Sequence, residues 1–534
     1  MTPEYRAEKE ASIVNLGGGG IWEINAVTAI APAAALIWAV LQTRQGFFKP
    51  YGLPAMASDF LIQCAAILFA TTVYASAPEV LTGFLVLPAV AAILQPDHRA
   101  SKAVAQPPKH KYEPTDEEMD PLPVKPFITT YRGAMMIITC ASILAVDFPV
   151  FPRRFAKTES FGTSLMDLGV GSFVFAAGIV AARQQLKEQH TKIRSFSSRM
   201  ISAMRHSLPL FALGVARLIS VKNLDYYEHV SEYGVHWNFF FTLALLPPVI
   251  AIIQPVLRYT FSYGILAFAI GIVYELCLYC VKDLKIYIIL SERKEGDWLS
   301  QNREGVFSFV GYLAIFIAGM GIGMGIMPRD PEEIDPRIKK AKKEDELDED
   351  ADWLASVIGD EKQQEEAEKA TQALLEPPPM KPEVPNWAWG YLLFWTGLWT
   401  VFAVWALWQY GPGLTVSRRM ANLGYIVWVC AFNTSQLLMF CGIERIMFPN
   451  LYKAKDNKTE RQRIQDATSK VLQAFNRNGL AIFLLANLLT GLINMTVPTL
   501  HMTDVQSMAI LLGYMATLCG FALALDHYNI SIKL

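Results

Sequence analysis

Charged side chains beside long apolar segments are the first candidates for chemistry in this sequence, because charge is costly next to lipid. The richest group lies where two such segments are joined. Asp147 ends the first segment, Arg153, Arg154 and Lys157 follow within ten residues, and Asp167 stands in the second. A carboxylate beside cations can take a proton while the cations stabilise an oxyanion. A salt-bridged hairpin without chemistry is the alternative, and the residues alone leave both open.

A second polar group stands before another apolar segment. His236 and Asn238 lie in the stretch Glu-Tyr-Gly-Val-His-Trp-Asn, in which the aromatic residues also fit an ordinary membrane interface. The imidazole of His236 is therefore either a competing base or an interfacial hydrogen-bonding group. Arg132 is a cation that falls inside the predicted membrane span 126–147.

Other residue patterns exclude some classes of function. Cys277 and Cys280 have CxxC spacing, but they lie in an apolar helical segment, which favours buried packing over metal or redox chemistry. No metal site is predicted. The formal net charge of −2 excludes a general basic surface for nucleic acid.

The elements that must position these residues are membrane helices. The 534 residues are 52% hydrophobic and only 18% charged, with a mean hydropathy of +0.27. A bilayer core takes about 20 apolar residues as a helix. We predict an all-α polytopic membrane protein with about thirteen transmembrane helices in one bundle. The predicted spans are 22–42, 57–76, 79–95, 126–147, 164–183, 208–222, 237–257, 260–281, 305–327, 387–409, 420–441, 478–498 and 504–525.

Lysine and arginine predict the orientation of the bundle. The loops on one side, together with the C-terminus, hold 32 of the 47 Lys and Arg residues, and the other side holds 14. Cytosolic loops are the ones enriched in these residues. We therefore expect a lumenal N-terminus and a cytosolic C-terminus. Asp147, Lys157 and His236 then face the lumen.

Two polar stretches divide the chain into groups of spans. Their composition is too charged and proline-rich to bury a core, which predicts cytosolic linkers. The predicted divisions are 1–95 (the first three spans), 96–125 (a cytosolic linker), 126–327 (spans four to nine, with the lumenal motifs), 328–386 (a flexible cytosolic loop) and 387–534 (spans ten to thirteen).

Four ordered blocks of the sequence resemble a known family. The first comprises ILAVDFPVFPRRFAKTE at 143–159 with SLMDLGVGSFVF at 164–175. The others are EYGVHWNFFFTLALLP at 232–247, NREGVFSFVGY at 302–312 and LANLLTGLINM at 485–495. Together they are similar to the GPI-anchor inositol acyltransferases, over essentially the whole chain except the two linkers.

This resemblance implies an enzyme of the endoplasmic-reticulum membrane. It would transfer a fatty acyl chain, typically palmitoyl, from acyl-CoA to the inositol ring of glucosaminyl-phosphatidylinositol, an early step of GPI-anchor assembly. In fungi the downstream consequence is anchoring of cell-wall mannoproteins. The implied partners are acyl-CoA, glucosaminyl-phosphatidylinositol and membrane lipids, with no nucleic acid and no cofactor besides acyl-CoA as co-substrate.

For that reaction we predict Asp147 as the base and Lys157 as the group that stabilises the oxyanion, with His236 as a competing base. The remaining candidates are assigned to substrate binding or to the support of Lys157: Arg153, Arg154, Asp167, Asn238 and Arg132. The alternative is a lipid or solute transporter that uses Asp147 and Lys157 as an intramembrane ion pair. A structural subunit of a GPI-assembly complex is a third class.

Overall fold

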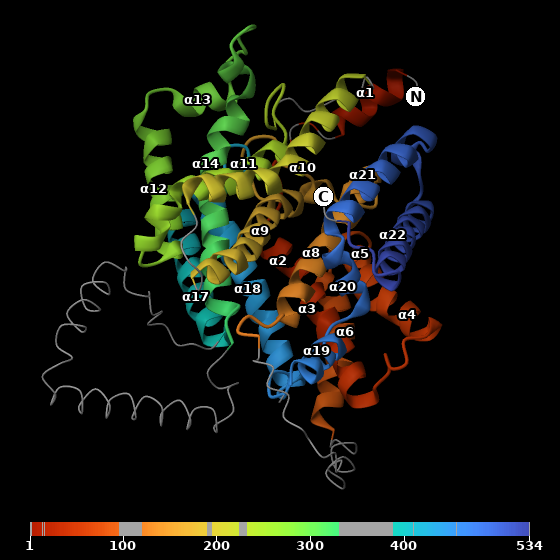
Figure 1. Ribbon diagram of the computed structural model, residues 1–534. Coiled ribbons are helices and arrows are strands. Elements are labelled where there is room, and N and C mark those ends of the chain that lie inside the picture. Colours follow the sequence, from red (N-terminus) through yellow and green to blue (C-terminus); the bar gives the residue numbers. More distant parts are fainter. Residues whose placement is uncertain are drawn as a thin grey trace, which may run out of the picture.

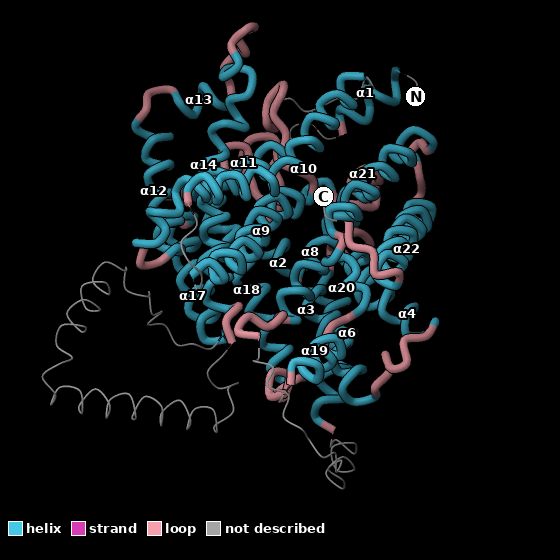
Figure 2. The backbone as a smooth tube through the Cα atoms, in the orientation of Figure 1, coloured by secondary structure: helices cyan, strands magenta, loops and turns pink. Residues whose placement is uncertain are grey.

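The computed structural model is a bundle of helices (Figures 1 and 2). It describes residues 3–12, 14, 16–95, 120–189, 195–223, 232–329, 388–409, 411–454 and 456–532. Within these ranges there is no strand, and an isolated bridge joins Gly18 and Thr163. The predicted all-α class is confirmed. Most of the two predicted linkers, 96–125 and 328–386, lies outside the described residues.

Eleven helical segments among the described residues are long and apolar enough to cross a bilayer. The first is built from α2 (Ile21–Thr28), α3 (Ile30–Val40) and η1 (Leu41–Gln45), and the second from α4 (Leu53–Phe60), η2 (Leu61–Ala65) and α5 (Ala66–Thr71). The other nine are α8 (Pro126–Ala145), α9 (Leu165–Gln189), α11 (Phe239–Tyr259), α12 (Tyr263–Cys280), α14 (Trp298–Ile326), α17 (Ala388–Leu407), α18 (Leu423–Met447), α21 (Gly479–Thr496) and α22 (Asp504–His527).

Two of the thirteen predicted spans fall on helices that do not meet this requirement. The span at 79–95 is α6 (Pro78–Leu94), whose 17 residues reach only about 25 Å at the rise of an α-helix. The span at 208–222 is the second half of α10 (Phe196–Asn223), which begins in a polar stretch and carries Pro209. The structure thus supports a polytopic bundle, whereas the count of thirteen stays a prediction.

The shorter helices lie at the ends of the bundle or between the spans. They are α1 (Pro3–Ala11), η3 (Arg153–Phe155), α13 (Leu284–Ile289), α19 (Asn457–Asp466), α20 (Lys470–Arg477) and η5 (Thr499–His501). Figure 1 shows α1 and α13 at one end and α19 at the other. We call these the α13 end and the α19 end. The turn from α8 to α9 and the first residues of α14 and α18 meet at the α13 end.

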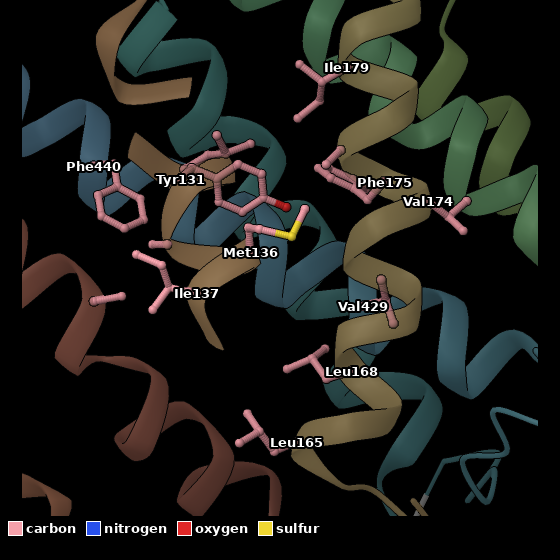
Figure 3. Close-up of a cluster of buried hydrophobic side chains, with 14 of the residues drawn as sticks. Tyr131, Met136, Ile137, Leu165, Leu168, Val174, Phe175, Ile179, Val429 and Phe440 are labelled. Atoms are coloured by element: carbon pink, nitrogen blue, oxygen red, sulfur yellow. The ribbon is translucent and has the colours of Figure 1, made fainter. Parts of the chain in front are cut away.

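The centre of the bundle is packed around α8, α9, α14 and α18. Figure 3 shows apolar side chains of α8, α9 and α18 pointing toward one another, among them Ile137, Phe175 and Val429. Glycines of α14 let α9 approach closely: a Cβ atom on Gly319 would lie 2.2 Å from the carbonyl oxygen of Phe175. Small residues at such crossings are typical of closely packed membrane helices.

Candidate active site

The turn between α8 and α9 carries most of the predicted site. Three buried phenylalanines, Phe148, Phe151 and Phe155, fasten this turn to the bundle and leave its charged residues at the α13 end. Arg153 turns back, and its Nη1 donates to the carbonyl oxygen of Val146 at 2.5 Å. Burial lowers the pKa of Arg153, and the nearby Asp147 carboxylate opposes that shift.

Asp147 lies in a closed ring of three polar side chains. Lys9 of α1 places its Nζ 2.9 Å from Oδ1 of Asp147. Asn494 of α21 donates from Nδ2 to Oδ2 of Asp147 at 2.9 Å and accepts from Lys9 Nζ at 3.0 Å through Oδ1. Both carboxylate oxygens of the predicted base are therefore engaged.

Lys157 belongs to a second network and makes no direct contact with Asp147 in the described structure. Its Nζ lies 2.9 and 3.0 Å from the two carboxylate oxygens of Glu232. Glu232 also lies 3.7 Å from Nη2 of Arg418. Nε of Arg418 lies 2.6 Å from Oδ1 of Asp167. Asp167 pairs with Arg418 and not with Nζ of Lys157, but it binds Thr158, the next residue along the chain. The predicted orientation of Lys157 by Asp167 stays a prediction.

Asp167 is held by groups from the α8–α9 turn and from α18. Thr158 donates to Oδ2 of Asp167 from its backbone N–H at 3.0 Å and from its hydroxyl at 2.7 Å. Ser164 accepts from the backbone N–H of Asp167 at 3.1 Å. Tyr425 of α18 donates to the backbone carbonyl of Asp167 at 2.7 Å. The two bonds from Thr158 and the ion pair with Arg418 satisfy the fully buried carboxylate, and the bonds of Ser164 and Tyr425 fix the backbone of Asp167.

The electrostatics of this second network are set by opposed effects. Burial alone would raise the pKa of Glu232, but Lys157 and Arg418 outweigh it and lower the pKa to about 2. Burial alone would lower the pKa of Arg418, but Glu232 and Asp167 outweigh it and raise that pKa. Glu232 and Arg418 therefore stay charged at neutral pH, and both carboxylate oxygens of Glu232 accept from Nζ of Lys157.

Arg154 joins the same turn to α2. Its Nε lies 2.5 Å from Oε1 of Glu23, and its Nη2 donates to the carbonyl oxygen of Ala75 at 3.4 Å. Its guanidinium also lies 5.2 Å from the ring centre of Phe155. Arg154 thus anchors the turn against α2 and the α5–α6 connection, and its predicted role in substrate binding stays a prediction.

The residues predicted before α11 take two different places. Asn238 is buried and caps α11, since its Oδ1 accepts from the N–H groups of Phe240 and Phe241 while its Nδ2 donates to the carbonyl of Gly214 at 2.9 Å. His236 is half-buried, and its backbone N–H donates to Oδ1 of Asn302 at 2.8 Å. The structure describes no ion pair or hydrogen bond of the His236 imidazole with the other described residues.

Arg132 lies far from the other predicted residues. It stands fifteen residues before Asp147 along α8 and the turn that follows, which corresponds to about 22 Å of helix. Its side chain makes no hydrogen bond or ion pair with another described residue. The structure therefore does not bring Arg132 into the α13-end site, and a substrate contact by Arg132 would have to be made in the half of α8 nearer the α19 end.

Two arginines of this end were missed by the sequence reasoning. Arg418 binds Asp167, and its neighbour Arg419 lies 2.9 Å from Oε1 of the buried Glu304. Glu304 is also contacted by Arg293 at 2.7 Å. The available signal was a pair of adjacent arginines just before a span, on the side of the membrane predicted to be poor in cations.

A narrow apolar cavity begins beside the second network. It has a volume of about 40 Å³ and lies between α3, α8, α9 and α18. Leu165 and Leu168, on the first turn of α9, line it and flank Asp167 in sequence (Figure 3). Phe440 lines this cavity and also a second one of about 30 Å³ nearer the α19 end. Phe440 is the lining residue that the two cavities share.

Neither a metal site nor the CxxC pair contributes to the candidate site in the part of the chain that the structure describes. Among the described residues no group of three or more His, Cys, Asp and Glu side chains could hold a metal ion. Cys277 and Cys280 are free thiols exposed on α12, so the predicted buried packing of these two residues is wrong.

The chain is similar to known proteins along essentially its whole length. The model of a family described as GWT1 matches residues 5–525. The "GPI-anchored wall transfer protein 1" of Gibberella zeae is 47% identical over 100% of this chain and 99% of that protein. The proteins of the same name from Aspergillus oryzae and Saccharomyces cerevisiae are 45% and 36% identical, with at least 99% of each chain covered.

Proposed function

Because the chain belongs to the GWT1 family, we propose that it is an O-acyltransferase of GPI-anchor assembly. A role in GPI-anchor biosynthesis follows from the family. The finer proposal is transfer of a fatty acyl chain, typically palmitoyl, from acyl-CoA to the inositol ring of glucosaminyl-phosphatidylinositol. It includes residence in the endoplasmic-reticulum membrane, with a lumenal N-terminus and a cytosolic C-terminus, so that the α13 end faces the lumen.

One observation carries this proposal beyond the family. The first turn of α9 presents Asp167 to the charged network and Leu165 and Leu168 to the apolar cavity. Acyl transfer needs a place for a hydrocarbon chain next to groups that stabilise negative charge. The cavity holds only about three water-sized groups, so binding of a long chain requires α8, α9 and α18 to move apart.

In the proposed reaction, Asp147 and Lys157 have different roles. Asp147 takes the proton of the inositol hydroxyl while that oxygen bonds to the thioester carbon of acyl-CoA. The third N–H of Lys157 stabilises the oxyanion of the tetrahedral intermediate. The intermediate collapses, the carbon–sulfur bond breaks, and the proton held by Asp147 passes to the departing CoA thiolate. The products are the inositol ester and CoA.

His236 is the competing base. Its imidazole is half-buried at the same end and makes no described ion pair, whereas both oxygens of Asp147 are engaged. Replacement of His236 by glutamine separates the two assignments. If Asp147 is the base, His236→Gln retains most of the rate and Asp147→Asn loses it.

The test is a reaction of purified protein with acyl-CoA and glucosaminyl-phosphatidylinositol, with the acylated product measured by mass spectrometry. We expect Asp147→Asn to lower the rate by about 10²–10⁴-fold, as removal of a general base does. We expect Lys157→Ala to lower it by about 10²–10³-fold, as removal of an oxyanion contact does. Both variants should insert into membranes in normal amounts.

Matched controls come from an ion pair at the α19 end. Lys49 and Asp466 lie 2.5 Å apart; Lys49 is exposed and Asp466 is half-buried, so Lys49→Ala and Asp466→Asn should acylate normally. Normal transfer by Asp147→Asn and Lys157→Ala would overturn the assignment of the site. Movement of the lipid across the membrane without consumption of acyl-CoA would favour the transporter alternative.

A further inference from the structure

The N-terminal helix α1 lies across the α13 end on polar contacts. The hydroxyl of Tyr5 accepts from the backbone N–H of Leu500 at 3.1 Å and lies 3.3 Å from the hydroxyl of Thr499. Glu8 lies 2.9 Å from Nε2 of His501, and both side chains are more than half exposed. The α1 side chains whose burial is described are all exposed or half-buried. Such contacts hold a helix weakly, since an exposed ion pair contributes about 0–1 kcal/mol.

One side chain of α1 reaches further than the others. Lys9 inserts its Nζ between Oδ1 of Asp147 and Oδ1 of Asn494, at 2.9 and 3.0 Å. A general base must approach the hydroxyl that it deprotonates to about 2.6–3.2 Å. The ammonium group of Lys9 therefore stands at the distance from Asp147 that the reacting hydroxyl needs.

The chain between α1 and α2 is suited to a moving helix. It includes Gly17 to Gly20, and of these Gly18 and Gly19 are fixed to Thr163. The N–H of Gly19 donates to the carbonyl of Thr163 at 2.7 Å, and the hydroxyl of Thr163 donates to the carbonyl of Gly19 at 2.6 Å. The anchor lies after α1 in the chain, so α1 can leave Asp147 without disturbing α2.

We propose that α1 is a lid over the acceptor site, and that Lys9 occupies, between Asp147 and Asn494, the position of the acceptor's reacting hydroxyl. This inference rests on the proposed function, because it takes Asp147 as the base. When the lid opens, a polyol hydroxyl replaces the ammonium group. Asn494 is then a positioning residue, since its amide holds Oδ2 of Asp147 and its carbonyl oxygen accepts from a neighbouring hydroxyl.

A reversible cross-link between α1 and the α21–α22 connection tests the lid. Glu8→Cys and His501→Cys are combined in a chain in which the exposed Cys277 and Cys280 are serine. A short bis-methanethiosulfonate reagent joins the two cysteines and is cleaved by reductant. We expect cross-linking to lower acylation at least about tenfold, the fall expected if the open state drops below a tenth of its population. Reductant should restore the rate.

A second variant tests the position of Lys9. Lys9→Met removes the competing ammonium group, and we expect the KM for glucosaminyl-phosphatidylinositol to fall roughly fivefold while the KM for acyl-CoA is unchanged. Glu4→Gln is the matched control, because Glu4 is an exposed α1 residue and should leave both constants as they are.

The outcomes of these experiments distinguish failure of the lid proposal from failure of the proposed acyltransferase function. Equal rates before and after cross-linking, or an unchanged acceptor KM in Lys9→Met, would overturn the lid while acylation by the free enzyme still supports the proposed function. Absence of any acylated product from the chain without cross-linker would overturn the proposed function, and the lid with it.

Discussion

Removal of either partner of the Asp167–Arg418 ion pair should destabilise the protein strongly. Asp167 is 0% exposed, the Arg418 side chain is 3% exposed, and the two lie 2.6 Å apart. Loss of one partner leaves the other charge buried with fewer compensating groups, which typically costs about 3–5 kcal/mol. Arg418→Met is the useful variant, because methionine keeps much of the volume and removes the charge.

The contribution of the pair itself is obtained from a double-mutant cycle. At an effective dielectric constant near 20, two unit charges at about 4 Å interact by roughly 4 kcal/mol. Arg418 also lies near Glu232, and Thr158 supplies two hydrogen bonds to Asp167, so part of this energy remains after one substitution. We therefore expect Asp167→Asn and Arg418→Met to be non-additive by about 2–3 kcal/mol.

The assay is the free energy of unfolding of the purified protein, measured by titration with a denaturing detergent in mixed micelles. The four chains of the cycle are compared at one pH and one lipid content. The control cycle uses Lys49 and Asp466, whose side chains are 52% and 31% exposed and should couple by less than about 1 kcal/mol. Additivity of Asp167→Asn and Arg418→Met within about 0.5 kcal/mol would refute the reasoning.

Two further predictions concern Glu232 and Asn238. Because the folded-state pKa of Glu232 is about 2, below its ordinary value, its stabilising contribution is fully present above about pH 5 and is lost as pH falls toward 2. The difference in unfolding free energy between the protein and its Glu232→Gln variant should therefore shrink by about 3 kcal/mol between about pH 6 and pH 2, and a constant difference would contradict the assignment. Asn238→Ala should cost at least about 1 kcal/mol through loss of the α11 cap, whereas Asn238→Ser should cost less because its hydroxyl can still cap the helix; acylation lost in both variants at unchanged stability would instead point to substrate binding.

Much of the fold was predictable because each membrane helix is determined by the composition of its own segment of the sequence. Each of the thirteen predicted spans coincides with a helix, since a long apolar run can satisfy its backbone in lipid only as a helix. The predictions were weakest for α6 and α10, where the run is short or begins in a polar stretch. The residues that carry charge at the α8–α9 turn were also found from local sequence, because prolines and cations there interrupt an apolar pattern.

The partners of those charges could not be read from the sequence. Asp147 meets Lys9 and Asn494, which lie 138 residues before it and 347 residues after it. Lys157 meets Glu232, and Asp167 meets Arg418. Local sequence suggested pairs within the turn, but its buried phenylalanines and the bond from Arg153 to Val146 direct the charges toward other helices.

The sequence by itself thus determined that the protein is a helical membrane bundle and which turn concentrates its charge, because both depend on residues close together in the chain. Only the tertiary structure decided which ions pair, that Asp147 is covered by Lys9, and that the first turn of α9 separates a charged network from an apolar cavity. The physical reason is that an ion pair depends on distances of a few ångströms between side chains, and these distances are set by how whole helices pack.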